Sequence, residues 1–206
     1  FFIEKSGQEE TVELILHLLT KKINSSFGLD PLKDVQVLVP TNRGVCGVIN
    51  LNARIQDTLN PGKIGLVHGN RMFRRGDRVI QLKNNYEKEI FNGDIGIILS
   101  IDTELKEMNI DFDGRTVTYS FYEADEISHS YAISIHKSQG SEFRCVIVPL
   151  LTSHYMLLQR NLLYTALTRA RQLAVLVGSK KAIGMAVNKN VVEKRFTGLR
   201  KLLQDI

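Results

Sequence analysis

Three apolar runs, at residues 35–39, 145–150 and 173–177, most constrain the fold of this chain. They are apolar almost without interruption, whereas a strand with one wet face alternates between apolar and polar residues. A strand that reads as a continuous apolar run is covered on both faces, as in a parallel sheet between two layers of helices. The runs therefore predict an α/β fold built on a parallel sheet.

Amphipathic helices are expected between these strands. Residues 6–9 have the spacing of a capping box, in which the Ser6 hydroxyl and the Glu9 carboxylate bond free backbone N–H groups at a helix start. Apolar residues then recur at helical spacing, at Val12, Ile15, Leu16, Leu19 and Ile23. A second helix carries Val48, Ile55 and Leu59 and ends before Pro61-Gly62.

Residues 70–127 interrupt this pattern with short apolar runs and no helical stretch. Turn signals separate the runs, at Gly76-Asp77, Asn92-Gly93-Asp94 and Asp113-Gly114. Several short strands in so short a segment predict a small β-barrel. Because the parallel-sheet pattern resumes near Tyr131, we expect a barrel at 70–127 inserted into a domain formed by residues 1–69 and 128–206.

Composition adds weaker constraints. A net charge of +5 favours an anionic partner, although such a balance is also common in proteins that bind no nucleic acid. Cys46 and Cys145 lie far apart in apolar settings, so we expect buried thiols and no metal site. No apolar run approaches the roughly 20 residues of a membrane span, and no signal peptide opens the chain, so we expect a cytoplasmic location. The chain begins with Phe1 inside an expected strand and reads as a piece of a longer protein.

Three polar stretches are candidate functional segments: residues 40–44, residues 136–142 and the expected helix 161–171. In open parallel sheets, ligands bind at the carboxyl ends of strands. His136, Lys137 and Ser138 offer donors suited to a phosphodiester backbone, and Gly140 permits a close backbone approach. The Glu142 carboxylate can accept from a ribose hydroxyl or orient a cation. A polar connection with a capping serine fits the same residues equally well.

The segment "NLLYTALTRAR" is read as a helix through residue 171. Leu163, Ala166, Leu167 and Ala170 would bury one side against the sheet, with Thr165, Thr168 and Arg169 on the other. Arg169 alone is typical of a solvated surface charge, and so is Arg43 after the strand at 35–39.

Other catalytic schemes fit less well. Asp125-Glu126 does not follow the buried strand that presents a magnesium-binding pair, and "NPGKIG" at 60–65 lacks the spacing of a phosphate-binding P-loop. We also find no GxSxG elbow and no cysteine in a setting that lowers its pKa.

Four stretches resemble the C-terminal motor half of superfamily 1 DNA helicases of the RecD-like and TraA-like group. "VLVPTNRG" (37–44) resembles helicase motif IV, "YAISIHKSQGSEF" (131–143) motif V and "LLYTALTRAR" (162–171) motif VI. "GDRVIQLKNNYEKEIFNGDIG" (76–96) resembles the start of the SH3-like barrel that this group inserts in its second RecA-like domain. The resemblance implies a RecA-like, P-loop-NTPase-type sheet without its own P-loop, interrupted by an SH3-like barrel.

The resemblance also implies a mechanism. ATP with Mg²⁺ would lie between two RecA-like domains, and the first domain, absent from this chain, would supply the P-loop and the magnesium-binding acids. Arg169 resembles the arginine finger and Arg43 the motif IV arginine, both directed at the γ-phosphate. Gly140 and Glu142 resemble nucleotide-binding residues, while Ser134, His136, Lys137 and Ser138 would face single-stranded DNA. We therefore expect part of a 5′–3′ DNA helicase that is inactive as an isolated fragment.

Partners and alternatives follow from the same resemblance. The expected partners are single-stranded DNA, the first RecA-like domain of the same protein and, in some settings, RecB-like and RecC-like subunits. The barrel would offer basic and stacking side chains, at Arg71, Arg74, Arg75, Arg78, Lys83 and Tyr86. Two alternatives stay open: the helicase part of a conjugative relaxase, and a non-catalytic nucleic-acid-binding module.

Overall fold

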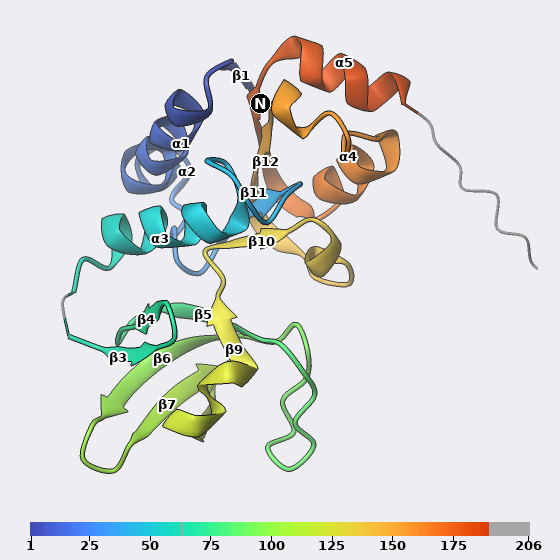
Figure 1. Cartoon of the computed structure of the whole chain (residues 1–206). Helices are drawn as coiled ribbons and strands as arrows, with labels where there is room; N and C mark the ends of the chain where they lie inside the picture. Colours follow the sequence, from blue (N-terminus) through green and yellow to red (C-terminus); the bar gives the residue numbers. More distant parts are fainter. Residues whose placement is uncertain (63, 190–206) are drawn as a thin grey trace, which may run out of the picture.

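A five-stranded parallel sheet organises one half of the molecule (Figure 1). The computed structural model describes residues 1–62 and 64–189. The strand order is β1 (Phe2–Glu4), β12 (Ala170–Gly178), β11 (Phe143–Leu150), β2 (Val35–Val39) and β10 (Ala132–Ser134), and each neighbouring pair is parallel. The predicted α/β class with a buried parallel sheet is confirmed.

Helices cover both faces of this sheet, which explains the continuous apolar runs. On one face Val35, Val37 and Val39 pack with α1 (Gln8–His17), its π-helical continuation Leu18–Lys22, α2 (Ile23–Phe27) and α3 (Val48–Leu59). On the other face Leu38, Val146 and Val148 pack with α4 (Arg160–Leu167) and α5 (Lys180–Asn188). Successive side chains of one strand therefore enter two different cores.

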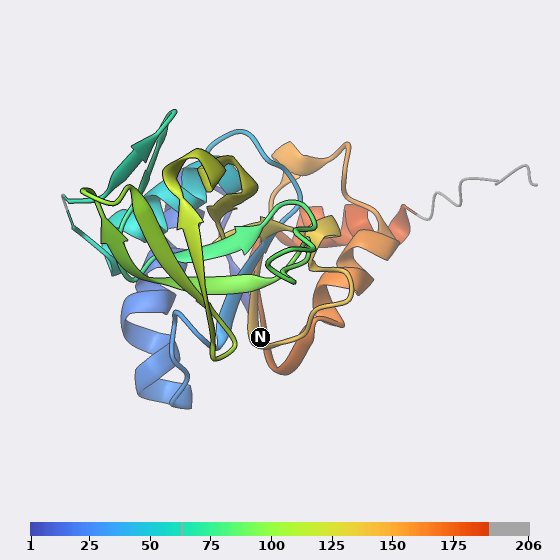
Figure 2. The same ribbon diagram turned by 90° about the horizontal axis from the view of Figure 1, so that it is seen from below.

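An antiparallel sheet forms the second half, and Figure 2 views the molecule from this side. Its order is β8 (Arg115–Ser120), β7 (Glu107–Phe112), β6 (Ile95–Asp102), β5 (Arg78–Gln81) and β9 (Ile127–His129). A hairpin of β3 (Leu66–His68) and β4 (Arg71–Phe73) lies beside it, and a 3-10 helix spans Phe121–Glu126. Phe73, Met108 and Tyr119 are fully buried in its core.

The two halves share side chains at their junction. Ile80 of β5 is buried in the same core as Leu38 and Val148 of the parallel sheet, and Leu82 and Ile95 pack against that core. The chain enters the antiparallel half between the end of α3 and the start of β3, and it leaves through Ser130 and Tyr131 alone, between β9 and β10.

Two local predictions were wrong. The helix near the N-terminus begins after Gly7, with no side-chain cap, because the Thr11 N–H bonds the Gly7 carbonyl and moves the cap one residue beyond Ser6. The helix predicted through residue 171 ends at Leu167, because Ala170 already pairs with Phe143 in the sheet. Leu167 consequently lies on the surface, 36% exposed.

Within residues 1–62 and 64–189, no helix combines the length and apolar character that crossing a membrane would require.

Candidate functional site

Two polar loops leave the parallel sheet at the same edge. Ser134, the last residue of β10, pairs with Val39, the last residue of β2. The loop of residues 40–47 and the segment of residues 135–142, which we call the crossing loop, therefore start side by side. His136 and Lys137 are exposed at this edge.

The crossing loop ends at the opposite edge of the sheet. It enters β11 at Phe143, which pairs with Ala170, the first residue of β12. Since Cys145 pairs with Val35, Phe143 lies about six residues from the level of Val39, or about 20 Å along the strand direction. The crossing loop thus connects the two edges, and Figure 1 shows it beside β10.

The structure does not bring Arg43 and Arg169 together. Arg43 lies in the exposed loop after β2, whereas Arg169 immediately precedes β12 at the opposite edge. That both arginines point at one phosphate group stays a prediction, which the parallel register disfavours because it separates the two loops by the length of the strands.

Arg169 instead contacts the far end of the crossing loop. Its guanidinium donates to the carbonyls of Ser141 at 3.1 Å and Thr165 at 3.3 Å, and to the Thr168 hydroxyl at 3.2 Å. The Phe143 N–H returns a bond to the Arg169 carbonyl at 2.8 Å. The side chain is half-buried, each of these acceptors is neutral, and among the residues that the structure describes no carboxylate pairs with Arg169.

Glu142 and Gly140 lie in the same stretch of the crossing loop. The Glu142 carboxylate accepts from Arg171 Nε at 2.7 Å, and both side chains are exposed. Gly140 has a φ of +89°, in the left-handed region that favours glycine, and nothing would touch an added Cβ there.

The near end of the crossing loop forms a 3-10 turn, His136–Ser138. Ser138 is fully buried, and its hydroxyl donates to the Ile135 carbonyl at 2.7 Å, so its side chain holds the turn. The Ser134 hydroxyl accepts from the Lys137 N–H at 3.3 Å. His136, Lys137 and Gln139 are exposed there, and their side chains make no hydrogen bond within residues 1–62 and 64–189.

The loop that carries Arg43 continues directly into α3. The Val48 N–H bonds the Thr41 carbonyl, and a Cβ on Gly47 would lie 2.5 Å from the Arg43 carbonyl, so the turn requires glycine. A hollow of about 200 Å³ beside it is lined by Arg43, Cys46 and Leu157, and Leu157 also lines a hollow with His136. Burial raises the pKa of the Cys46 thiol to about 11, which leaves it unreactive.

A groove separates the crossing loop from the antiparallel half. Its walls are the turn Asn92–Gly93–Asp94 on one side and His136, Lys137, Gly140 and Ser141 on the other, and its volume is about 560 Å³. A larger hollow of about 730 Å³ adjoins it and shares Gly93, Asp94 and Ser141.

Three of the basic side chains proposed for DNA contact have structural roles instead. Arg78 is 4% exposed and donates to the carbonyls of Leu32 and Val35. Arg74 donates to Asn60 and Asp57, and Arg71 to the Ile127 carbonyl. The remaining two basic candidates, Arg75 and Lys83, and the stacking candidate Tyr86 are exposed.

The sequence reasoning missed a polar cluster between the two halves, around the fully buried Asp77. A signal was present in α3, where Asn52, Gln56 and Asn60 recur at intervals of four and so share one face of the helix. Amides at such spacing on a helix face that must be covered indicate buried polar partners.

Comparisons with known proteins agree with this arrangement. The family model described as "ATP-dependent RecD-like DNA helicase SH3 domain" matches residues 51–112, and that of the "UvrD-like helicase C-terminal domain" matches residues 129–177. The Pif1 helicase from Bacteroides, solved with ADP-AlF3 and single-stranded DNA, aligns with 96% of this chain and 50% of its own at a TM-score of 0.57 and 20% identity. That likeness shows the fold.

Among curated relatives, the ATP-dependent RecD2 DNA helicase of Deinococcus radiodurans is 41% identical over 72% of this chain and 20% of its own length. The RecD subunit of the RecBCD enzyme of Mycolicibacterium smegmatis is 30% identical over 85% of this chain and 30% of its own. The fold and these matches define a helicase motor domain of the RecA-like class. Within that class, the chain belongs to the RecD-like helicases and corresponds to their C-terminal region.

Proposed function

We propose that this chain is the second motor domain of an ATP-dependent DNA helicase that moves 5′ to 3′. In this proposal residues 1–69 and 128–206 form the motor domain and residues 70–127 form the inserted barrel, although β3 and β9, which lie at these bounds, pair with strands of the barrel. The observation that carries it is the crossing loop, which joins the edge that holds His136 to the edge that holds Arg169. A single segment with one end at each ligand is suited to convert ATP binding into movement along a strand.

The edge at Arg169 is the proposed nucleotide side. Arg169 would neutralise charge that develops on the γ-phosphate, a role worth about 10³ to 10⁵ in rate in enzymes of this kind. Gly140 would let the backbone approach the nucleotide, and Glu142 would accept from its ribose. Arg171, which pairs with Glu142, would keep that carboxylate in place.

The opposite edge is the proposed DNA side. Ser134, His136 and Lys137 would bond the phosphodiester backbone, and Ser138 would act through the turn that its hydroxyl holds. Arg43 lies at this edge, so we move it from the catalytic set to the strand contacts.

ATP and Mg²⁺ would be held mainly by a first RecA-like domain of the same protein, which supplies the phosphate-binding chemistry. The chain spans 20–30% of the length of the first curated relatives, so the activity of the whole protein is part of this proposal. Its cytoplasmic location, its partnership with RecB-like and RecC-like subunits and the inactivity of the isolated chain belong to the proposal as well.

The test uses Arg169→Ala in the full-length protein that contains this chain. DNA-stimulated ATP hydrolysis should fall by at least about 10³-fold while the affinity for a dT oligonucleotide stays within about twofold. Arg144→Ala is the matched control, because Arg144 is an exposed arginine in β11 that pairs with Asp34. Equal loss of hydrolysis and DNA binding in Arg169→Ala would assign Arg169 to folding and overturn the proposal.

A further inference from the structure

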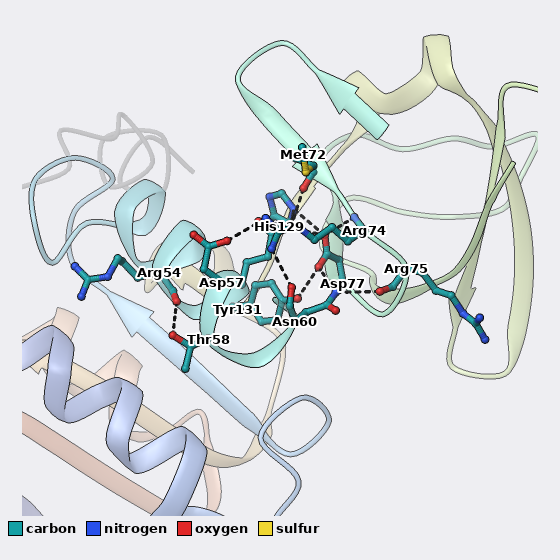
Figure 3. Close-up of polar contacts among 11 residues, drawn as sticks. Arg54, Asp57, Thr58, Asn60, Met72, Arg74, Arg75, Asp77, His129 and Tyr131 are labelled. Atoms are coloured by element: carbon teal, nitrogen blue, oxygen red, sulfur yellow. Dashed lines mark hydrogen bonds and ion pairs between the residues drawn. The ribbon is translucent and has the colours of Figure 1, made fainter. Parts of the chain in front are cut away.

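The Asp77 carboxylate lies at the centre of a cluster between the two halves, shown in Figure 3. Asp77 precedes β5 and is fully buried. Its Oδ1 accepts from Asn60 Nδ2 at 2.7 Å and from the Tyr131 hydroxyl at 2.8 Å. Its Oδ2 lies 2.6 Å from Gln56 Nε2, 2.7 Å from the Arg74 N–H and 3.1 Å from His129 Nε2.

The donors in this cluster can be counted. The Gln56 amide has two N–H groups, and the Met72 carbonyl at 2.8 Å and Asp77 take both. His129 Nε2 must then donate to Asp77 rather than accept from Gln56. The carboxylate consequently receives five hydrogen bonds, and although burial raises the pKa of Asp77, the bonds from His129, the Arg74 N–H and Asn60 lower it on balance.

The donors come from both halves of the molecule. Gln56 lies near the end of α3 and Asn60 is its C-cap. Tyr131 belongs to the two-residue return connection, and Arg74 and His129 belong to the antiparallel half. Asn60 Nδ2 also donates to the Arg75 carbonyl at 2.9 Å. One buried charge therefore joins the barrel, the helix after the Arg43 loop and the connection to β10.

The return connection is held on both sides. Asn52 of α3 bonds both the N–H and the carbonyl of Ala132, at 2.9 and 2.8 Å. Gln36 of β2 donates to the carbonyls of Ser130 and Tyr131, at 3.0 and 3.1 Å. Since β10 leads directly into the crossing loop, these amides hold the root of that loop.

A second buried contact links the barrel to the parallel sheet beside the Asp77 cluster. The Arg78 guanidinium reaches out of β5 to the Leu32 and Val35 carbonyls, at 2.9 and 2.6 Å, and lies 6.0 Å from the ring centroid of Phe143. Asp77 and Arg78 are adjacent in sequence and both are buried, and together with Ile80 in the shared core they hold the barrel against the parallel sheet.

We propose that Asp77, with Gln56 and Asn60, is a positioning residue that sets the orientation of the barrel on the parallel sheet. The orientation determines the width of the groove between Asn92–Gly93–Asp94 and the crossing loop. That this groove admits a DNA strand rests on the proposed function, whereas the positioning role does not.

The experiment measures a distance between the two halves of the chain. Spin labels are attached at Thr103→Cys, in the turn between β6 and β7, and at Lys181→Cys on α5, both exposed positions. Cys46 and Cys145 are buried and should not react. Asp77→Asn, Gln56→Ala and Asn60→Ala are compared with Asp57→Asn, whose exposed carboxylate pairs with Arg74 at the same junction.

The parent chain and Asp57→Asn should each give one narrow distribution of the distance between the spin labels. Each of the three cluster variants should give a distribution at least twice as wide. Circular dichroism should show that both halves are still folded in these variants. Affinity for a dT oligonucleotide should fall about tenfold in the same variants. Unchanged distributions in the cluster variants, with only a lower melting temperature, would overturn the positioning role. If Asp77→Asn does not fold, Gln56→Ala and Asn60→Ala decide, because each removes one donor and keeps the carboxylate. If the parent chain binds no DNA, the DNA contacts of the proposed function are wrong. The distance distributions would still test the positioning role of Asp77.

Discussion

Arg169 Nη1 donates to the Ser141 carbonyl at 3.1 Å, so the arginine two residues beyond the end of α4 contacts the crossing loop. Lysine keeps the charge but lacks the planar fork that bonds Ser141 and Thr165 together. We predict that Arg169→Lys in the full-length protein lowers DNA-stimulated hydrolysis at least ~100-fold at saturating ATP. Steady-state kinetics would check this, and hydrolysis within tenfold of the parent would show that charge alone suffices.

Arg43 should affect DNA rather than hydrolysis, because it lies at the edge of His136. Arg43→Ala should weaken binding of a dT oligonucleotide. It should also reduce the slope of log affinity against log salt concentration by about the amount that one phosphate contact contributes. Fluorescence anisotropy over a series of salt concentrations measures both. A loss of hydrolysis at saturating DNA, with the salt slope unchanged, would return Arg43 to the nucleotide.

Two arginines of the barrel form a matched pair for stability. Arg78→Ala leaves the Leu32 and Val35 carbonyls without their donor in a buried site and should cost roughly 2–4 kcal/mol in the free energy of unfolding. Arg75→Ala, at an exposed position, should change it by less than about 0.5 kcal/mol. Urea denaturation of the chain compares them, and similar effects of the two changes would contradict the structural role of Arg78.

Gly140 and Gly184 provide a second pair, since a Cβ would meet nothing within 4 Å at either position. The φ of +89° at Gly140 strains any other residue, so Gly140→Ala should destabilise the chain by roughly 1 kcal/mol. Gly184 lies inside α5, where alanine is the better helix former, and Gly184→Ala should stabilise by about 0.5–1 kcal/mol. Urea denaturation measures both effects, and the midpoint should fall for Gly140→Ala and rise for Gly184→Ala. Shifts of the same sign in the two variants would contradict the prediction.

Asp77 should make stability depend on acid pH. Its pKa is lowered in the folded chain, so its contribution is fully present above the ordinary value of 3.8 and is lost as the pH falls through the lower folded value. Asp77→Asn should therefore cost roughly 2–4 kcal/mol at pH 7, and the difference from the parent should shrink only below the ordinary aspartate pKa. Urea titrations at several pH values test this, and a difference that already shrinks between pH 7 and 5 would contradict the assigned direction.

The sequence was sufficient for features that depend on local pattern. The runs at 35–39 and 145–150 predicted a sheet buried on both faces, and residues 37, 38 and 39 do alternate between two cores. The turn signals at Asn92-Gly93-Asp94 and Asp113-Gly114 predicted the antiparallel strands that flank them. Both kinds of signal report side-chain periodicity and turn chemistry, which are properties of neighbouring residues.

Features that depend on long-range register were not predictable in the same way. The sequence does not show that β11 pairs with both β2 and β12, and this pairing places Arg43 and Arg169 at opposite edges. Because Ala170 pairs with Phe143 in the sheet, α4 ends at Leu167, although the helical periodicity continues to residue 171. The partners of Asp77 come from three separate stretches, residues 56–60, 74 and 129–131, so the amides near the end of α3 indicate buried polar partners without showing which ones.

Ile80 lies in β5 of the barrel, yet its side chain is buried with Leu38 and Val148 of the parallel sheet. The barrel therefore cannot be transplanted or deleted as a self-contained module. Excising residues 70–127 would open a hole in the core of its host, and grafting them elsewhere would carry an apolar side chain into water. Leu82 and Ile95 pack against the same core, so protein engineers who wish to exchange the barrel must redesign the host surface beneath it.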